Sequence, residues 1–167
     1  RPAAYCGVAA YKPSSQLISR SGVKLNADTL DEVGVFARGM DDLAFIASIL
    51  AVKPLWKDLP EQGRAGAAPA LAVVATSQSH LASPRMLAAL EAVATQAAHR
   101  GARRVEATWP RVFDGLFEAQ RAVQLFETAR SLAPEYMYRR ARLSQRMIET
   151  LDAGRALATH DYAAALQ

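Results

Sequence analysis

The sequence lacks the features that mark several protein classes. Its single cysteine, Cys6, cannot form a disulfide within the chain, so a reduced, cytoplasmic setting is the default expectation. The longest clearly apolar run, residues 67–75, is less than half of the roughly 20 residues that a membrane-spanning helix needs. We therefore expect a soluble protein with no membrane partner.

Signatures of metal, nucleotide and nucleic-acid binding are missing as well. The three histidines, His80, His99 and His160, are far apart and form no short-spaced metal motif. The glycines fit neither the Walker pattern nor GxGxxG, so no phosphate loop is predicted. Aromatic residues make up only 7% of the chain, and none accompanies the basic residues at base-stacking spacing. We expect no metal, no cofactor and no nucleic-acid partner.

What is present is typical of one globular domain. The chain has 167 residues, of which 51% are hydrophobic and 22% charged, with a formal net charge of +4. Such a chain can bury a sizeable core, and wholesale disorder is not expected. The densest basic cluster, Arg139, Arg140, Arg142 and Arg146, is interpreted as a solvated helix face rather than a phosphate-binding patch.

The first half of the chain changes its pattern near residue 40. Glycine and proline punctuate residues 1–26, where short strands are predicted at 7–11 and 16–25. Residues 41–51 have an apolar stripe at helical spacing, which predicts a core-facing helix with two acidic residues in its first turn. Prolines and small residues over 53–69 predict a long irregular connection.

Residues 70–110 predict a strand–helix–strand unit. The strands are expected at 70–76 and 103–108, and Ser83 and Gly101 are placed to cap the helix between them. Because short joints link these elements, the strands should be parallel, which gives an α/β fold with the sheet buried between helices. Residues 111–167 are predicted to be helical, with helices at 113–132 and 134–151 and a short last helix that Gly154 separates.

Several motifs in the first fifty residues agree in order and spacing with one known family. They are RPAAYCGV at 1–8, YKPS at 11–14, SRSGV at 19–23, LDEVGVFAR at 30–38, and Asp41-Asp42. Together they resemble the second half of the amidase signature region, which would occupy residues 1–52. Farther along, a strand ending in Trp109-Pro110 and helices bearing Glu127 and Tyr136 are similar to the family's usual succession.

The resemblance implies an amidase signature fold, α/β with part of a mixed or parallel sheet covered by helices, which this chain would contribute as a single partial domain. It also implies hydrolysis of the C–N bond of a small or aryl amide by a serine, a second serine held by a cis peptide, and a lysine. In the family these three residues precede the position of Arg1, so no catalytic residue is expected here. The expected partners are the amide substrate and the remainder of the same polypeptide, and a homodimer is left open.

Two positions are carried over as substrate-binding residues, Arg1 and Glu32. Arg1 would lie beside the nucleophile, where an ion pair within the protein is an equal alternative to a substrate contact. Glu32 departs from the threonine or glutamine usual in similar sequences, and its carboxylate would repel acidic substrates. Asp31 and Cys6 are expected to be structural residues near the site, Asp31 bonding to backbone in a turn and Cys6 buried as a small hydrophobe. The neighbouring Lys12 and Ser14 are interpreted as a coincidence rather than a catalytic pair.

Two other functions stay open. One is a non-catalytic subunit that keeps the amidase fold without the triad. The other, within the same family, is the glutamine amidotransferase subunit that acts on misacylated tRNA, which should require partner subunits. Sequence upstream of residue 1 would distinguish a non-catalytic subunit from an enzyme. Co-purification with partner subunits would identify an amidotransferase subunit.

Overall fold

The computed structural model describes residues 2–53 and 68–167. The chain divides into two compact units, one formed by residues 1–58 together with 118–167 and the other by residues 59–117. Most of the connection predicted at 53–69 lies outside the described residues. Each unit has its own secondary structure and its own small sheet.

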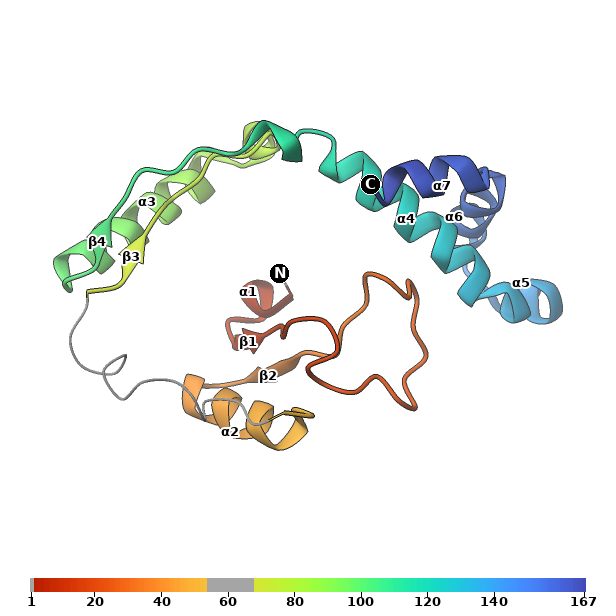
Figure 1. Ribbon diagram of the computed structural model, residues 1–167, viewed down its shortest axis with the longest axis horizontal. Coiled ribbons are helices and arrows are strands. Elements are labelled where there is room, and N and C mark those ends of the chain that lie inside the picture. Colours follow the sequence, from red (N-terminus) through yellow and green to blue (C-terminus); the bar gives the residue numbers. More distant parts are fainter. Residues whose placement is uncertain (1, 54–67) are drawn as a thin grey trace. The chain divides into compact units, whose positions relative to one another are not determined.

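The first unit begins with a small antiparallel sheet and a helix. A one-turn helix α1 (Pro2–Cys6) precedes strand β1 (Ala9–Tyr11), which pairs with β2 (Val35–Ala37), and helix α2 (Met40–Leu50) follows (Figure 1). The strand predicted at 16–25 is wrong: that stretch forms turns, with one isolated bridge from Ile18 to Ala51. The partner of β1 instead comes after this long loop, in residues for which the sequence pattern predicts no strand.

Helix α2 confirms the predicted helix but buries a narrower face than expected. Leu43 and Ala47, one turn apart, are buried, whereas Ile49 is 64% exposed and Leu50 is also exposed. Asp41 and Asp42 occupy the first turn, where the positive end of the helix dipole stabilises their negative charges. The short β1–β2 sheet covers only part of the apolar stripe, so the rest of it faces outward.

The second unit is the predicted strand–helix–strand. Strand β3 (Ala70–Leu71) runs parallel to β4 (Arg103–Arg104), and helix α3 (Pro84–His99) connects them (Figure 1). The Ser83 hydroxyl accepts the backbone N–H of Met86 at 3.2 Å, and Gly101, with φ +97°, follows the helix end. Both strands are shorter than predicted, because each pairs over only two residues.

Helices dominate the rest of the first unit. They are α4 (Leu116–Ser131), α5 (Ala133–Arg139), α6 (Gln145–Ala156) and α7 (Thr159–Ala165) (Figure 1). The single helix predicted over 134–151 is interrupted, because Leu143 is extended and the Ser144 hydroxyl starts α6 by accepting the backbone N–H of Met147. Gly154 does not separate two helices as predicted but lies buried within α6.

The helical core centres on α4 and α6. Val123, Phe126 and Ala129 of α4 are buried, as is Leu151 of α6, whose side chain is fully enclosed. The small antiparallel and parallel sheets, with helices increasing toward the end of the chain, confirm the α/β class. None of the helices in the described ranges is long and apolar enough to cross a membrane.

Candidate functional site

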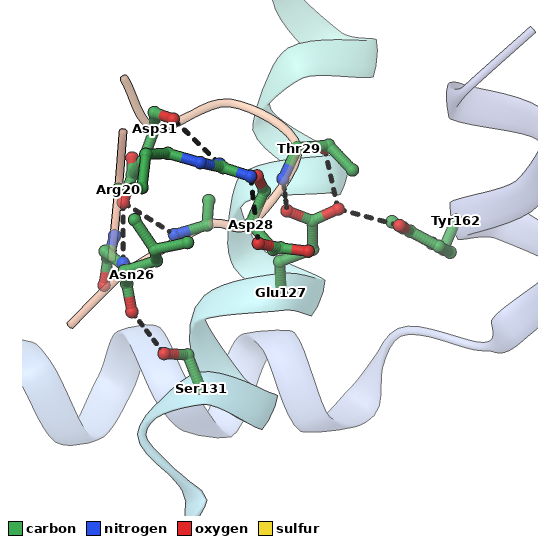
Figure 2. A network of polar contacts seen from close by, with 10 residues as sticks. Arg20, Asn26, Asp28, Thr29, Asp31, Glu127, Ser131 and Tyr162 are labelled. Carbon is green, nitrogen blue, oxygen red and sulfur yellow. Dashed lines mark hydrogen bonds and ion pairs between the residues drawn. The ribbon is translucent and has the colours of Figure 1, made fainter. Parts of the chain in front are cut away.

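The loop that carries the family-like motifs is tied together by its own backbone. The Asp31 carboxylate accepts the backbone N–H groups of Asn26 at 2.6 Å and Ala27 at 3.0 Å (Figure 2). The Arg20 guanidinium donates to the carbonyls of Asp28 and Asp31, and its other terminal nitrogen lies 3.5 Å from the Asp28 carboxylate. These contacts close residues 20–31 into a defined loop, the 20–31 loop.

A buried glutamate on α4 fastens this loop to the helices. Glu127 is only 8% exposed, and its Oε2 accepts the backbone N–H of Thr29 at 2.8 Å. Its Oε1 accepts two hydroxyls, that of Thr29 at 2.8 Å and that of Tyr162 on α7 at 2.7 Å (Figure 2). One carboxylate, with both of its oxygens satisfied, therefore holds Thr29, which lies 98 positions away in the chain, and Tyr162, which lies 35 positions away.

Two further contacts join the loop to the same helices. The Ser131 hydroxyl, one turn beyond Glu127 on α4, donates to the backbone carbonyl of Leu25 (Figure 2). The Lys24 ammonium lies 2.5 Å from the Glu135 carboxylate of α5. The loop is thus held at three points along its length, and of the helix side chains that hold it Glu127 is a buried one.

The environment of Glu127 keeps it ionised. Burial alone raises the pKa of its carboxyl, but hydrogen bonds from the Thr29 backbone, the Tyr162 hydroxyl and the Thr29 hydroxyl together bring the pKa below its ordinary value. The hydrogen bond that Tyr162 donates to Glu127 raises the pKa of Tyr162 in turn. The carboxylate, rather than the carboxylic acid, is the form that the fold stabilises.

We expect the stabilising effect of Glu127 to be lost in acid. Since the folded pKa lies below the ordinary value of 4.5, the contribution is complete above pH 4.5 and disappears as the pH falls through the folded pKa. The difference in unfolding free energy between the native chain and Glu127→Gln should therefore shrink below pH 4.5. Urea unfolding at neutral pH and at successively lower pH measures it, and a difference that stays constant would contradict the assignment.

A pocket of about 510 Å³ lies where the loop meets the helices. Loop residues from Val23 to Thr29 form one wall, one face of α4 forms another, and Tyr162 of α7 completes it. The Tyr162 ring is stacked on that of Phe126, with centroids 4.1 Å apart. The pocket therefore combines an aromatic surface with the polar groups that fasten the loop.

Glu32 follows the 20–31 loop and is half-buried. Its Oε2 is enclosed but has no hydrogen-bond partner among the described residues. The Ser15 hydroxyl, the Gln16 backbone, Arg20 and Lys12 lower the pKa of its carboxyl against a smaller opposing effect of burial, so it is ionised at neutral pH. Arg1, the other predicted substrate-binding residue, lies outside the described residues, so its role stays a prediction.

The remaining candidate residues are placed as follows. Cys6 ends the single turn of α1 and is exposed, so the prediction that it is buried is wrong; a five-residue helix encloses only Ala3. The Lys12 ammonium donates to the Pro13 carbonyl at 2.5 Å. Within residues 2–53 and 68–167, no cluster of three histidine, cysteine or acidic side chains could hold a metal ion.

Sequence reasoning missed most of the groups that meet at Glu127. Glu127 itself is part of the family resemblance, but Thr29 and Tyr162 carry no local signal, since their role depends on contacts 98 and 35 residues away. Arg20 lies in one of the family-like motifs, yet nothing in that motif indicates what it binds. A single sequence shows these residues only as ordinary polar side chains.

Comparisons with known proteins agree with this fold. The family model described as Amidase matches residues 1–157. A crystal structure of an amidase superposes on 99% of the chain with a TM-score of 0.85 at 23% identity. The native peptide amidase of Stenotrophomonas maltophilia superposes on 95% with a TM-score of 0.64 at 20% identity. The chain covers 36% and 39% of those two structures, respectively.

Curated proteins similar to this chain include one component of an amidotransferase. A subunit of the mitochondrial glutamyl-tRNA(Gln) amidotransferase of Mycosarcoma maydis is 48% identical over 50 residues, which is 30% of this chain and 9% of that protein. The corresponding subunit from Deinococcus radiodurans is 43% identical over 51 residues, 30% of this chain and 11% of that protein. The chain thus matches only about a tenth of these relatives' length. The family match, by contrast, spans nearly the whole sequence, and the chain belongs to the amidase family.

Proposed function

We propose that this chain is part of an amidase that hydrolyses the C–N bond of a small or aryl amide through a Ser-cisSer-Lys mechanism. The observation that carries the proposal is the amidase family match over residues 1–157. The likeness of the fold to solved amidases supports it. The nucleophilic serine, the bridging serine and the lysine would come from residues outside 1–167, and the remainder of that polypeptide would be the chain's main partner.

In this proposal the described residues position the site rather than react. A neutral lysine takes the proton of the nucleophilic serine through the bridging serine as the serine oxygen attacks the amide carbon, and backbone N–H groups stabilise the oxyanion. The C–N bond then breaks as this proton passes to the leaving nitrogen, and water hydrolyses the acyl-enzyme. The part of this chain is to hold the 20–31 loop in one conformation through Asp31 and Glu127. Glu32, directly after that loop, is then presented in a fixed place.

We further propose that Glu32 disfavours acidic amides. Its carboxylate is ionised, and one oxygen is enclosed without a hydrogen-bond partner in the described part of the chain. A substrate carboxylate brought near it would meet a like charge in a partly desolvated setting. If the Arg1 guanidinium pairs with Glu32, it is also withheld from an acidic substrate.

Replacing Glu32 by glutamine in the active enzyme is expected to change substrate preference. The ratio of kcat/KM for a carboxylate-bearing amide to that for its neutral analogue should rise about tenfold. Parallel assays of ammonia release on the two amides give this ratio. The control Glu118→Gln removes an exposed carboxylate from the first turn of α4 and should leave the ratio unchanged. An unchanged ratio in Glu32→Gln would contradict this proposal and leave Arg1 and Glu32 with structural roles only.

A second candidate function is that of an amidotransferase subunit. It is favoured by the 48% identity over 50 residues to the glutamyl-tRNA(Gln) amidotransferase component of Mycosarcoma maydis. Such a protein should co-purify with partner subunits and release ammonia from glutamine when they are present. A non-catalytic subunit with the amidase fold would instead release no ammonia, whether partner subunits are present or absent.

The test of the proposed function compares the 167-residue chain with the product of its complete reading frame. The complete product should release ammonia from a neutral aryl amide, whereas the chain alone should release none above the buffer background. Lys12→Ala and Ser14→Ala in the complete product should retain activity, because neither residue belongs to the proposed triad. Ammonia release by the chain alone that either substitution abolishes would overturn the placement of the catalytic residues.

A further inference from the structure

The pockets of the first unit differ in their balance of charge. The pocket of about 510 Å³ at the loop has two carboxylates, Asp28 and Glu127, beside one guanidinium, that of Arg130. A second pocket, of about 390 Å³, sets Glu135 against Arg139. In both of these pockets the lining contains at least one carboxylate as well as a guanidinium group.

A third pocket, of about 330 Å³, is different. It is lined by Arg130 of α4 and Arg155 of α6, with only Ala129 and Ala133 besides them. Two guanidinium groups therefore border one cavity that has no carboxylate in its lining. The two alanines are small, so the space between the arginines is left open.

Both arginines are held in place by aromatic rings. The Arg130 guanidinium lies 3.1 Å from the centroid of the Phe126 ring and donates to the Phe126 carbonyl. The Arg155 guanidinium lies 4.9 Å from the centroid of the Tyr136 ring. Such cation–π contacts favour one placement of a flexible side chain before any ligand binds.

The nearby acidic groups already have other partners. The Asp152 carboxylate accepts the hydroxyl of Tyr136 and lies 3.4 Å from the guanidinium of Arg140. Both oxygens of Glu127 accept hydrogen bonds from other groups of the loop and α7. Within the described ranges, neither Arg130 nor Arg155 forms an ion pair. Two guanidinium groups that border one cavity and form no direct ion pair among the described residues are suited to bind an oxyanion.

We propose that the pocket between Arg130 and Arg155 binds the carboxylate or phosphate group of a small ligand. The planar fork of each guanidinium matches the oxygens of either group. The site uses residues that the proposed amide hydrolysis does not require. Its existence can therefore be tested without reference to catalysis.

The experiment is a titration of the full 167-residue chain with inorganic phosphate and, separately, with acetate. The arginine side-chain N–H signals are followed in ¹H–¹⁵N spectra at constant ionic strength maintained with sodium chloride. The variant Arg155→Gln should weaken phosphate binding about tenfold, since it removes one fork. The control Arg146→Gln removes an exposed guanidinium from the same helix and should change the dissociation constant by less than about twofold. Arg155→Lys keeps the charge and should restore part of the loss.

The outcomes distinguish a phosphate ligand from a carboxylate ligand. Tighter binding of phosphate than acetate identifies a phosphate group as the ligand, and equal affinities identify any small oxyanion, carboxylates included. Signal shifts that do not saturate, or that Arg155→Gln and Arg146→Gln reduce equally, would show general charge attraction and overturn the proposal. The circular dichroism spectrum of each variant, unchanged from that of the parent, shows that the fold is retained.

Discussion

Glu127→Leu is expected to lower the free energy of unfolding by about 3 kcal/mol, because it leaves three hydrogen-bond donors of the loop and α7 without their acceptor. Leucine has a similar volume, so the loss reports the hydrogen bonds rather than a cavity. Glu127→Gln should cost only about 1 kcal/mol, since an amide oxygen can still accept the Thr29 backbone N–H while hydroxyls can turn to accept its NH₂ group. Urea unfolding followed by circular dichroism measures both.

Two controls make the Glu127 series specific. Glu118→Leu changes an exposed carboxylate on the same helix and should cost less than about 1 kcal/mol. Tyr162→Phe should destabilise the native chain but add little to Glu127→Leu, since the hydrogen bond is already lost in that background. Full additivity of Tyr162→Phe and Glu127→Leu would contradict a shared network.

Gly154→Ala is expected to destabilise the chain by about 3 kcal/mol. A Cβ at this position would overlap the backbone carbonyl oxygen of Leu125 and lie 2.8 Å from the Cβ of Ala129. Helix α4 would have to move away from α6 to relieve this overlap. Helix propensity alone predicts the opposite sign, a gain of about 1 kcal/mol for alanine in a helix interior. The shift of the urea midpoint at neutral pH therefore decides between the two effects.

Gly115→Ala is the matched control for Gly154→Ala. An added Cβ at Gly115 meets nothing within 4 Å, so the change should stay within about 0.5 kcal/mol. If Gly154→Ala were as stable as Gly115→Ala, the close approach of α4 and α6 would be wrong.

Elements with local signals could be predicted from the sequence. Helix α3 is an example, because Ser83, Pro84 and Gly101 mark its ends within the segment itself. The strand–helix–strand unit could be predicted as well, because the connections between its elements are short. By contrast, β2 could not be predicted, because its assignment depends on pairing with β1 across the long loop between them. The same limit explains the strand wrongly predicted at 16–25.

Gly154 shows how a residue type can mislead. A glycine between two helical stretches is typical of a helix end, but here the missing side chain allows one backbone to approach another. The partner, Leu125, lies on a different helix, and no pattern around Gly154 indicates it. The interruption of the predicted helix instead falls at Leu143, where Ser144 provides a local cap that the apolar pattern alone does not show.

The candidate site was only partly predictable for the same reason. Family-like motifs placed Asp31 and Glu32 near it, but the fastening of the loop depends on Glu127 and Tyr162, which are distant in the chain. The positive charge of the pocket between α4 and α6 could not be predicted either, since its two arginines lie on separate helices. Both features arise where separate helices pack together, so no single segment of the sequence indicates them.

The measurement that tests the central claim most directly is covalent labelling of the active serine. The product of the complete reading frame is treated with an aryl sulfonyl fluoride, and the labelled peptide is identified by mass spectrometry while ammonia release from a neutral aryl amide is followed. The account predicts that loss of activity parallels labelling of one serine outside residues 1–167. Labelling of Ser14 or another serine within this chain, in step with the loss of activity, would contradict it.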